Sequence, residues 1–153
     1  MSTQNINRVD HVMYIAWPEN QAEYVEKLSK LCRVRFYGPV DKPELGVRLY
    51  ISWAAGLEVV SPISDTLPWS LHMKDYLQRR GEGVMNVVFG VRDINEAKDH
   101  AASLGYTPSE LIENSGDEPY AAETEIMKET VVGDFINTMF TFGEIKLGPD
   151  PLI

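Results

Sequence analysis

The sequence predicts an α+β fold built from two βαβββ modules in tandem. The main observation is a strand-to-helix phrase that occurs twice, as HVMYIAWPENQA from His11 and as NVVFGVRDINEA from Asn86, 75 residues later. The ends of the two halves also match, because GLEVVSP ends at Pro62 and GEIKLGP ends at Pro149. Two such modules placed edge to edge would form a curled mixed sheet around one cavity.

The first module is predicted over residues 7–66. Residues 8–17 alternate between two faces, as in a strand, and His11, Met13 and Ile15 share one face. Pro18 suits the first turn of the helix that follows. The helix has its apolar residues at helical spacing: Tyr24, Val25, Leu28 and Leu31. Three strands are predicted after it, in RVRFYGPV, GVRLYISWA and LEVVSP.

Residues 67–83 are predicted to link the modules through a helix that ends at the phrase RRGEG. The second module is predicted over residues 84–149. Its helix begins at a capping box formed by Asp93 and Glu96, and Gly105 ends it. Three strands are predicted in SELIEN, FINTMFTF and EIKLGP. We expect the two modules to form one domain together.

A long insertion distinguishes the second module from the first. Residues 109–134 contain eight acidic residues and one Lys. A connection of this length is typical of a cover over a site, of a mobile segment or of a solvated loop without function. The sequence leaves these alternatives open.

Composition excludes several classes of protein. The chain has a formal charge of −9 and no run rich in Lys or Arg, which disfavours binding to nucleic acid or to anionic membranes. The N-terminus has no hydrophobic signal core, and no apolar run approaches the roughly 20 residues of a membrane span. We therefore expect a cytoplasmic protein. Cys32, the only cysteine, ends an apolar helical pattern and is predicted to be buried and inert.

Several phrases, in this order, resemble the vicinal oxygen chelate superfamily. They are DHV at Asp10–Val12, LEVVSP at Leu57–Pro62 and RRGEGVMNVVFGVRDINEA at the start of the second module. The superfamily contains glyoxalases, bleomycin-resistance proteins and extradiol dioxygenases. The resemblance is greatest to methylmalonyl-CoA epimerase and glyoxalase-like members, and it covers about residues 7–149.

The resemblance implies a metal site to which the first and last strands of each module contribute ligands. His11 and Glu58 match the ligands of the first module. Asn86 stands where a second His is expected, and the fourth position falls on Ile145 or Lys146, depending on the alignment. Because half of the set is replaced, the resemblance leaves open whether a divalent metal ion is bound.

Two functions are consistent with these residues. The first is an isomerase, epimerase or lyase that abstracts a proton next to a carbonyl, with Glu58 as base or metal ligand and His11 as its partner. The residues expected to contact the substrate are Asn86, Met13, Arg48, Tyr50 and Lys146. The alternative is a metal-free protein that sequesters a small ligand. The resemblance also implies a homodimer.

Overall fold

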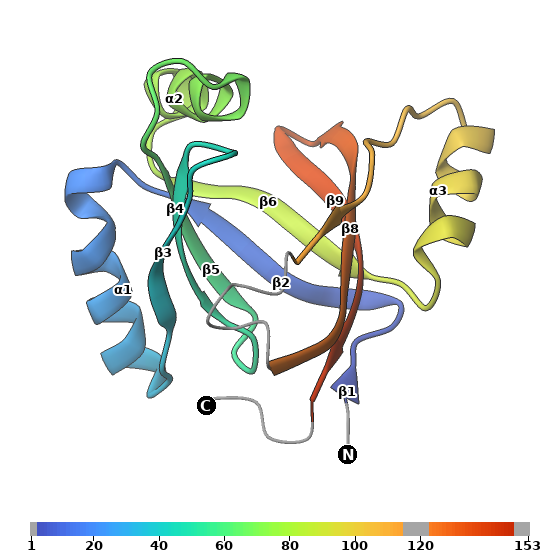
Figure 1. Cartoon of the computed structure of the whole chain (residues 1–153), viewed down its shortest axis with the longest axis horizontal. Coiled ribbons are helices and arrows are strands. Elements are labelled where there is room, and N and C mark those ends of the chain that lie inside the picture. The colour runs from blue at the N-terminus through green and yellow to red at the C-terminus, as the bar shows by residue number, and fades with distance from the viewer. Residues whose placement is uncertain (1–2, 115–122, 149–153) are drawn as a thin grey trace. The chain divides into compact units, whose positions relative to one another are not determined.

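The computed structural model describes residues 3–114 and 123–148 of the 153-residue chain. These residues form three helices and a mixed β-sheet, and the α+β fold with two βαβββ modules is confirmed (Figure 1). The first module consists of β2 (Arg8–Ile15), α1 (Pro18–Cys32), β3 (Tyr37–Lys42), β4 (Val47–Ser52) and β5 (Leu57–Pro62). After α2 (Pro68–Arg80), the second consists of β6 (Gly83–Gly90), α3 (Ile94–Ser103), β7 (Ile112–Glu113), β8 (Thr124–Phe135) and β9 (Thr138–Leu147). A short strand, β1 (Thr3–Gln4), pairs with β9.

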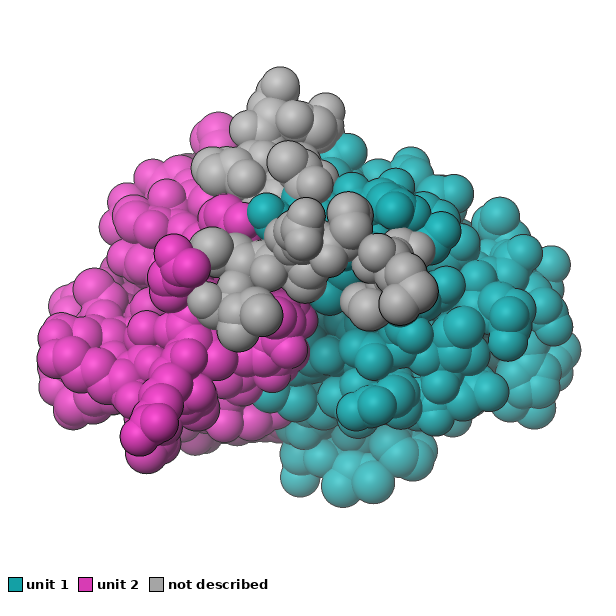
Figure 2. Space-filling view, turned by 90° about the horizontal axis from the view of Figure 1, so that it is seen from below, with its two compact units in different colours: residues 1–12, 85–151 teal, residues 13–84, 152–153 magenta. Residues whose placement is uncertain are grey.

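The chain divides into two compact units, which Figure 2 shows in different colours. Unit 1 contains residues 1–12 and 85–151, and unit 2 contains residues 13–84 and 152–153. This division does not follow the module boundary, because β2 and β6 each run from one unit into the other. That the two modules form one domain stays a prediction.

In unit 2 the strands are ordered β3-β4-β5-β2, and α1 packs on one face of them (Figure 1). The centre of this packing is a buried cluster of Ala16, Val25 and Val59. Gln21 links α1 to β4 and β5 by hydrogen bonds. Its amide nitrogen donates to the backbone carbonyl oxygens of Arg48 at 2.9 Å and of Val59 at 3.0 Å. The helix therefore covers one face through both apolar burial and buried hydrogen bonds.

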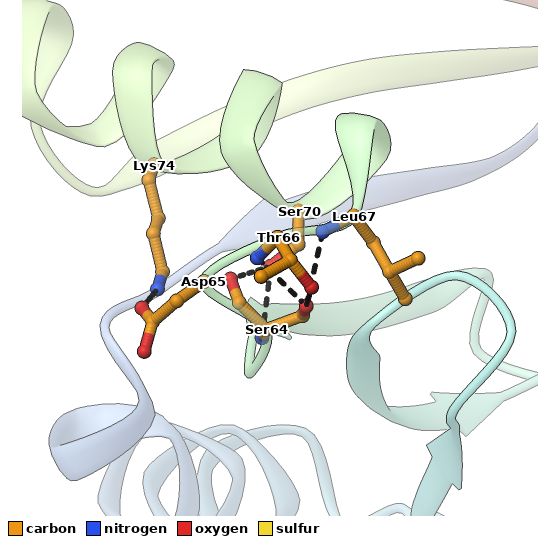
Figure 3. Close-up of polar contacts among 6 residues, drawn as sticks. All are labelled: Ser64, Asp65, Thr66, Leu67, Ser70 and Lys74. Carbon is orange, nitrogen blue, oxygen red and sulfur yellow. Dashed lines mark hydrogen bonds and ion pairs between the residues drawn. The ribbon is translucent and has the colours of Figure 1, made fainter.

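Helix α2 begins in a network of short polar side chains (Figure 3). The Ser64 hydroxyl accepts hydrogen bonds from the backbone N–H groups of Thr66 and Leu67, at 3.2 and 3.1 Å. Ser70, one turn into the helix, donates to the Ser64 carbonyl at 2.8 Å. These hydrogen bonds fix the turn that precedes α2, whereas its N-cap residue, Leu67, makes no side-chain cap.

In unit 1 the strands are ordered β2-β6-β9-β8-β7. β6 and β9 run parallel, whereas β8 and β9 form an antiparallel hairpin. The hairpin turns at Ile136 and Asn137, both with positive φ, as tight hairpin turns require. Helix α3 begins as predicted, since the Asp93 carboxylate accepts from the backbone N–H groups of Asn95 and Glu96.

The strands of the second module differ from the prediction. β7 lies within the predicted strand SELIEN, but β8 lies mostly in the later part of residues 109–134, where no strand is predicted. Most of the predicted strand FINTMFTF joins EIKLGP in one strand, β9, because Gly143 continues the ladder opposite Glu129. The first residue of FINTMFTF, Phe135, ends β8, and Ile136 and Asn137 form the hairpin turn. Residues 115–122 of the insertion lie outside the described residues.

Three predictions about the first module are wrong in detail. β3 begins at Tyr37 rather than Arg33, because Arg33 ends α1 in a left-handed conformation. Leu31 is 82% exposed, although it belongs to the predicted apolar stripe, and Cys32 is exposed rather than buried. Both residues lie in the last turn of α1. Within the described parts of the chain, no helix combines the length and apolar character needed to cross a membrane.

Candidate functional site

The face of the unit 1 sheet that α3 does not cover contains a cluster of polar side chains. α3 contacts the face that holds Phe140 and Phe142, and the backbone N–H of Ile94 donates to Glu144 on the same face, at 2.9 Å. Because neighbouring residues of a strand point to opposite faces, Thr141 and Ile145 lie on the face that α3 does not cover. Both are buried, and we call this face of unit 1 the site face.

His11 is the centre of the site face. Its side chain is only 2% exposed, and each ring nitrogen lies near a carboxylate. Nδ1 donates to Asp10 Oδ1 at 2.8 Å, and Nε2 lies 3.6 Å from Glu129 Oε1. Asp10 is itself held by Asn5, whose amide nitrogen donates to Oδ2 at 3.1 Å. The Asp10 contact fixes the ring so that Nε2 points across the site face.

The contact between His11 and Glu129 shows that the sheet of unit 1 is curled. β2 and β8 are three strands apart in the order β2-β6-β9-β8. In a flat sheet their backbones would be separated by roughly 14 Å. Side chains that meet at 3.6 Å from such distant strands require a concave surface between them. The site face is therefore the concave side of this sheet.

Asn86 lies on the site face in β6, the neighbour of both β2 and β9. It is 7% exposed, and its Oδ1 accepts a hydrogen bond from the Thr141 hydroxyl at 2.9 Å. This bond fixes the orientation of the amide and leaves the two N–H donors of Nδ2 to other partners. Asn86 can thus donate to a carbonyl or hydroxyl oxygen placed over the sheet.

The residues of unit 1 do not fit the metal site that the resemblance implies. The Asn86 oxygen is occupied by Thr141, and Ile145, on the site face of β9, offers no ligand atom. Glu144 lies on the other face, where it accepts from α3. Across the described residues, no three His, Cys, Asp or Glu side chains lie close enough to share a metal ion. A resident divalent ion needs about three protein ligands, so this donor set does not fit one.

Two further predicted site residues belong to unit 2. Met13 is buried in β2, two residues after His11 and therefore on the same side of that strand. Glu58 lies in β5 and pairs with Ile51 of β4. Its neighbour Val59 packs against α1, so Glu58 points to the face of unit 2 that α1 does not cover. The Glu58 side chain is half-buried rather than enclosed.

Three predicted substrate contacts lie elsewhere. Tyr50 packs against the cluster beneath α1, and Arg48, two residues earlier, lies on the same face. Arg48 forms a bidentate ion pair with Asp41, at 2.7 and 3.1 Å. That hydrogen bonding holds the pKa of the Asp41 carboxyl below its usual value. Lys146 shares the α3 face of β9 with Glu144 and pairs with Glu125 at 3.0 Å. None of the three joins His11 and Asn86.

Three residues that contact His11 or Asn86 were not predicted from the sequence: Asp10, Thr141 and Glu129. Asp10 precedes His11 directly in the phrase DHV, and an acid beside a histidine is a signal that could have been used. Glu129 lies in the predicted acidic insertion. In β8 it shares a face with the apolar residues Met127 and Val131, and this mixture of charged and apolar residues gives no clear sequence signal for a strand.

The phrase RRGEG, which contributed to the resemblance, has a structural role in unit 2. Glu82 accepts hydrogen bonds from the Trp17 backbone N–H at 2.9 Å, from the Asn20 amide and from the Tyr24 hydroxyl at 2.7 Å. Burial raises the pKa of the Glu82 carboxyl, but these hydrogen bonds outweigh it, so the net shift is downward. Glu82 therefore holds the start of α1 as a charged carboxylate.

Each unit also contains an open pocket with mainly apolar walls. In unit 2 a cavity of about 360 Å³ lies beside α1 and is lined by Tyr14, Tyr24 and Leu28 among others. In unit 1 a cavity of about 280 Å³ lies between the end of α3 and the β8–β9 hairpin, where Phe140 and Phe142 line it. Both lie on helix-covered faces, away from the site face.

Comparison with known proteins gives matches in structure only. No family model matches the chain, and no curated protein matches it in sequence. A methylmalonyl-CoA epimerase from Mycobacterium tuberculosis superposes with a TM-score of 0.66 at 12% identity, over 94% of this chain and 91% of the other. A variant of the Streptomyces coelicolor methylmalonyl-CoA epimerase, in complex with 2-nitronate-propionyl-CoA, has a TM-score of 0.67 at 16% identity, over 92% and 98%.

A hypothetical protein from Bacillus halodurans is similar as well, with a TM-score of 0.64 at 16% identity, over 94% of each chain. At these identities the matches establish the fold, and they extend over nearly the whole length of each partner. They agree with the order of strands and helices described above. The chain shares its fold with these methylmalonyl-CoA epimerases.

Proposed function

We propose that the protein is an enzyme of the isomerase or epimerase type that removes a proton next to a carbonyl group of a small oxygenated substrate. The observation that carries this proposal is the pairing of buried His11 with Asp10 and Glu129 on the concave site face. Buried histidine and carboxylate groups placed in this way are typical of sites that transfer protons.

Residue roles follow from the chemistry of proton removal. Glu58 is the base that the sequence predicts, and a carboxylate in this role takes the proton from the carbon next to the carbonyl. The electron pair left on the carbon moves toward the carbonyl oxygen, which becomes an enolate. His11 and the Nδ2 donors of Asn86 are the groups proposed to stabilise that oxygen. Met13 would contribute an apolar wall.

The structural neighbours suggest a first class of substrate to test. Among them are methylmalonyl-CoA epimerases in complex with CoA thioesters. The sequence contains no run rich in Lys or Arg that could bind the phosphate groups of CoA, and this argues against a CoA ester. We therefore propose a 2-substituted thioester or acid as substrate and leave CoA itself as one member of the test panel.

The proposal is tested by incubating the protein in D₂O with such a panel. It contains methylmalonyl-CoA, the same acyl group on a truncated thiol, 2-hydroxy acids and 2-oxo acids. Deuterium incorporation at the carbon next to the carbonyl is followed by NMR. We expect catalysed exchange with at least one compound and a loss of about 100-fold or more in Glu58→Gln. Absence of exchange with every compound contradicts the proposal.

The second candidate is a protein that sequesters a small apolar ligand without chemistry. It is favoured by the two apolar pockets, one in each unit. Native mass spectrometry of the purified protein distinguishes the two functions. A ligand that co-purifies, binds stoichiometrically and undergoes no exchange in D₂O supports sequestration, whereas turnover of that ligand supports the enzyme.

A further inference from the structure

We propose that the cavity beside α1 in unit 2 binds a small soluble molecule that carries a quaternary ammonium group. The cavity has a volume of about 360 Å³, and its walls combine aromatic rings, aliphatic side chains and a carboxylate. The inference does not depend on the proposed reaction, because none of the residues to which that reaction is assigned lines this cavity.

One wall of the cavity is a stripe of α1. Tyr24, Leu28 and Leu31 follow one another at intervals of four and three residues, so they share one side of the helix. Leu31 lines the cavity and is nevertheless 82% exposed. An apolar side chain in this position can be covered by a ligand, which would remove its surface from water.

Two phenol rings from different elements line the cavity. Tyr14 comes from β2 and Tyr24 from α1, and both also pack against the buried cluster beneath the helix. Contact with this cluster limits the freedom of both rings. The face of such a ring attracts a cation that lies within about 6 Å of its centroid.

The charge in the cavity wall favours a positive ligand. Glu82 lines the cavity and is ionised at neutral pH, because its pKa lies below the usual value. Lys27 lines it as well, but its ammonium group pairs with Glu23 at 2.6 Å. The stem of Lys27 therefore borders the cavity while Glu23 offsets its charge, and the carboxylate of Glu82 remains.

The hydrogen bonds of Glu82 favour a cation without N–H groups. Its two oxygens already accept from the Trp17 backbone, the Asn20 amide and the Tyr24 hydroxyl. A primary ammonium group that leaves water needs acceptors in exchange, and these acceptor positions are largely taken. A quaternary ammonium group needs none, since charge and contact with aromatic rings hold it.

Binding is measured by NMR titration of the full chain with three probes of similar size. They are choline, its uncharged isostere in which carbon replaces the nitrogen, and ethanolamine. We expect choline to bind with a dissociation constant of about 1 mM or lower and to shift the amide signals of Tyr14, Leu28 and Gly83. The other two probes should bind at least about 10-fold more weakly.

Three outcomes of this titration overturn the inference. They are no binding of choline, equal binding of the uncharged isostere or of ethanolamine, and shifts confined to unit 1. Phosphatidylcholine carries the same ammonium group on a lipid surface, so the protein is also sedimented with phosphatidylcholine vesicles. We expect it to stay in solution, and co-sedimentation overturns the assignment to a small soluble molecule.

Substitutions at the two charges should act in opposite directions. Glu82→Gln should weaken choline binding about fivefold or more, whereas Lys27→Met, which keeps the stem, should strengthen it about threefold. A gain in affinity cannot result from a damaged fold, so Lys27→Met remains decisive if Glu82→Gln disturbs the start of α1. Unchanged affinity in Lys27→Met overturns the inference.

Glu26→Gln is the matched control, because Glu26 pairs with Lys30 on the same helix and neither residue lines the cavity. It should change the affinity less than about 1.5-fold. The aromatic contribution is tested at Tyr14: Tyr14→Phe, which keeps the ring, should stay within about twofold of the wild type, and Tyr14→Leu should lose about fivefold or more. Equal affinities in these two variants overturn the inference.

Discussion

At the scale of single residues, the chemistry of the site depends on the neighbours of His11. Asp10 is adjacent in sequence, whereas Glu129 is 118 positions away and reaches the ring only because the sheet curls. The substitution of Asn86 for a second histidine has a partner in Thr141, whose hydroxyl fixes the amide. The side-chain oxygen of Asn86 is therefore already engaged in a hydrogen bond within the site face.

Asp10→Asn tests the positioning of His11. The substitution preserves shape but removes the charge that faces Nδ1 at 2.8 Å. We expect the exchange rate to fall about 10-fold or more, with KM nearly unchanged, because the ring of His11 loses the carboxylate that orients it. Steady-state kinetics measure the effect. An unchanged kcat would show that Asp10 does not position His11 for the reaction.

Gly46→Ala tests a close contact in unit 2. Gly46 has φ of +70°, and a Cβ atom there would lie 2.5 Å from Ser64 Cβ, in the network that begins α2. We expect a loss of about 1–3 kcal/mol in the free energy of unfolding, from backbone strain and displacement of Ser64. Denaturant unfolding measures it.

The control for this substitution is Gly105→Ala. Gly105 has φ of +93°, but a Cβ atom added there would meet no other atom within 4 Å. It should therefore show the cost of the backbone conformation without the steric clash. Equal losses at the two glycines would mean that the contact with Ser64 does not matter.

At the scale of elements, the start of α1 depends on a carboxylate from a distant loop. Glu82 accepts from Trp17, Asn20 and Tyr24, and these hydrogen bonds hold its pKa below the ordinary value of 4.5 despite the opposing effect of burial. A depressed pKa in the folded state means that the stabilising effect is complete above pH 4.5. It is lost as the pH falls through the lower folded-state value.

Glu82→Gln should therefore lower Tm at pH 7, and the difference from the wild type should shrink as the pH falls below about 4.5. Thermal unfolding between pH 3 and pH 7, followed by circular dichroism, measures this difference. Glu23→Gln is the control, because Glu23 forms an exposed pair with Lys27 within α1. A difference between wild type and Glu82→Gln that is the same at every pH would exclude the charged form as the cause.

At the scale of the whole molecule, the resemblance implies pairing of two copies. β3 lies at the end of the strand order in unit 2, so its outer edge presents backbone groups that a second copy could pair with. We expect sedimentation equilibrium to give a mass of twice 17.3 kDa. A mass of 17.3 kDa at micromolar concentration would contradict the dimer.

The sequence predicted the first module and both module helices well, because its signals there are local. Pro18 and Asp93 mark helix starts, and period-2 alternation marks β2 and β6. It failed in the second half, where the polar residues of β8 resemble those of a loop. A strand that carries charged side chains on a partly exposed surface has no clear apolar period, so only its pairing with β9 identifies it.

By itself the sequence determined the fold class and the two modules, because repetition and periodicity are properties of the chain. It also predicted His11 and Asn86 as site residues. Only the tertiary structure decided which side chains surround His11. Arg48, Tyr50 and Lys146 alternate in strands as site residues would, but packing against α1 and pairing at the α3 face take them elsewhere. Glu129 joins His11 because curvature brings distant strands together, and curvature results from the packing of the whole sheet.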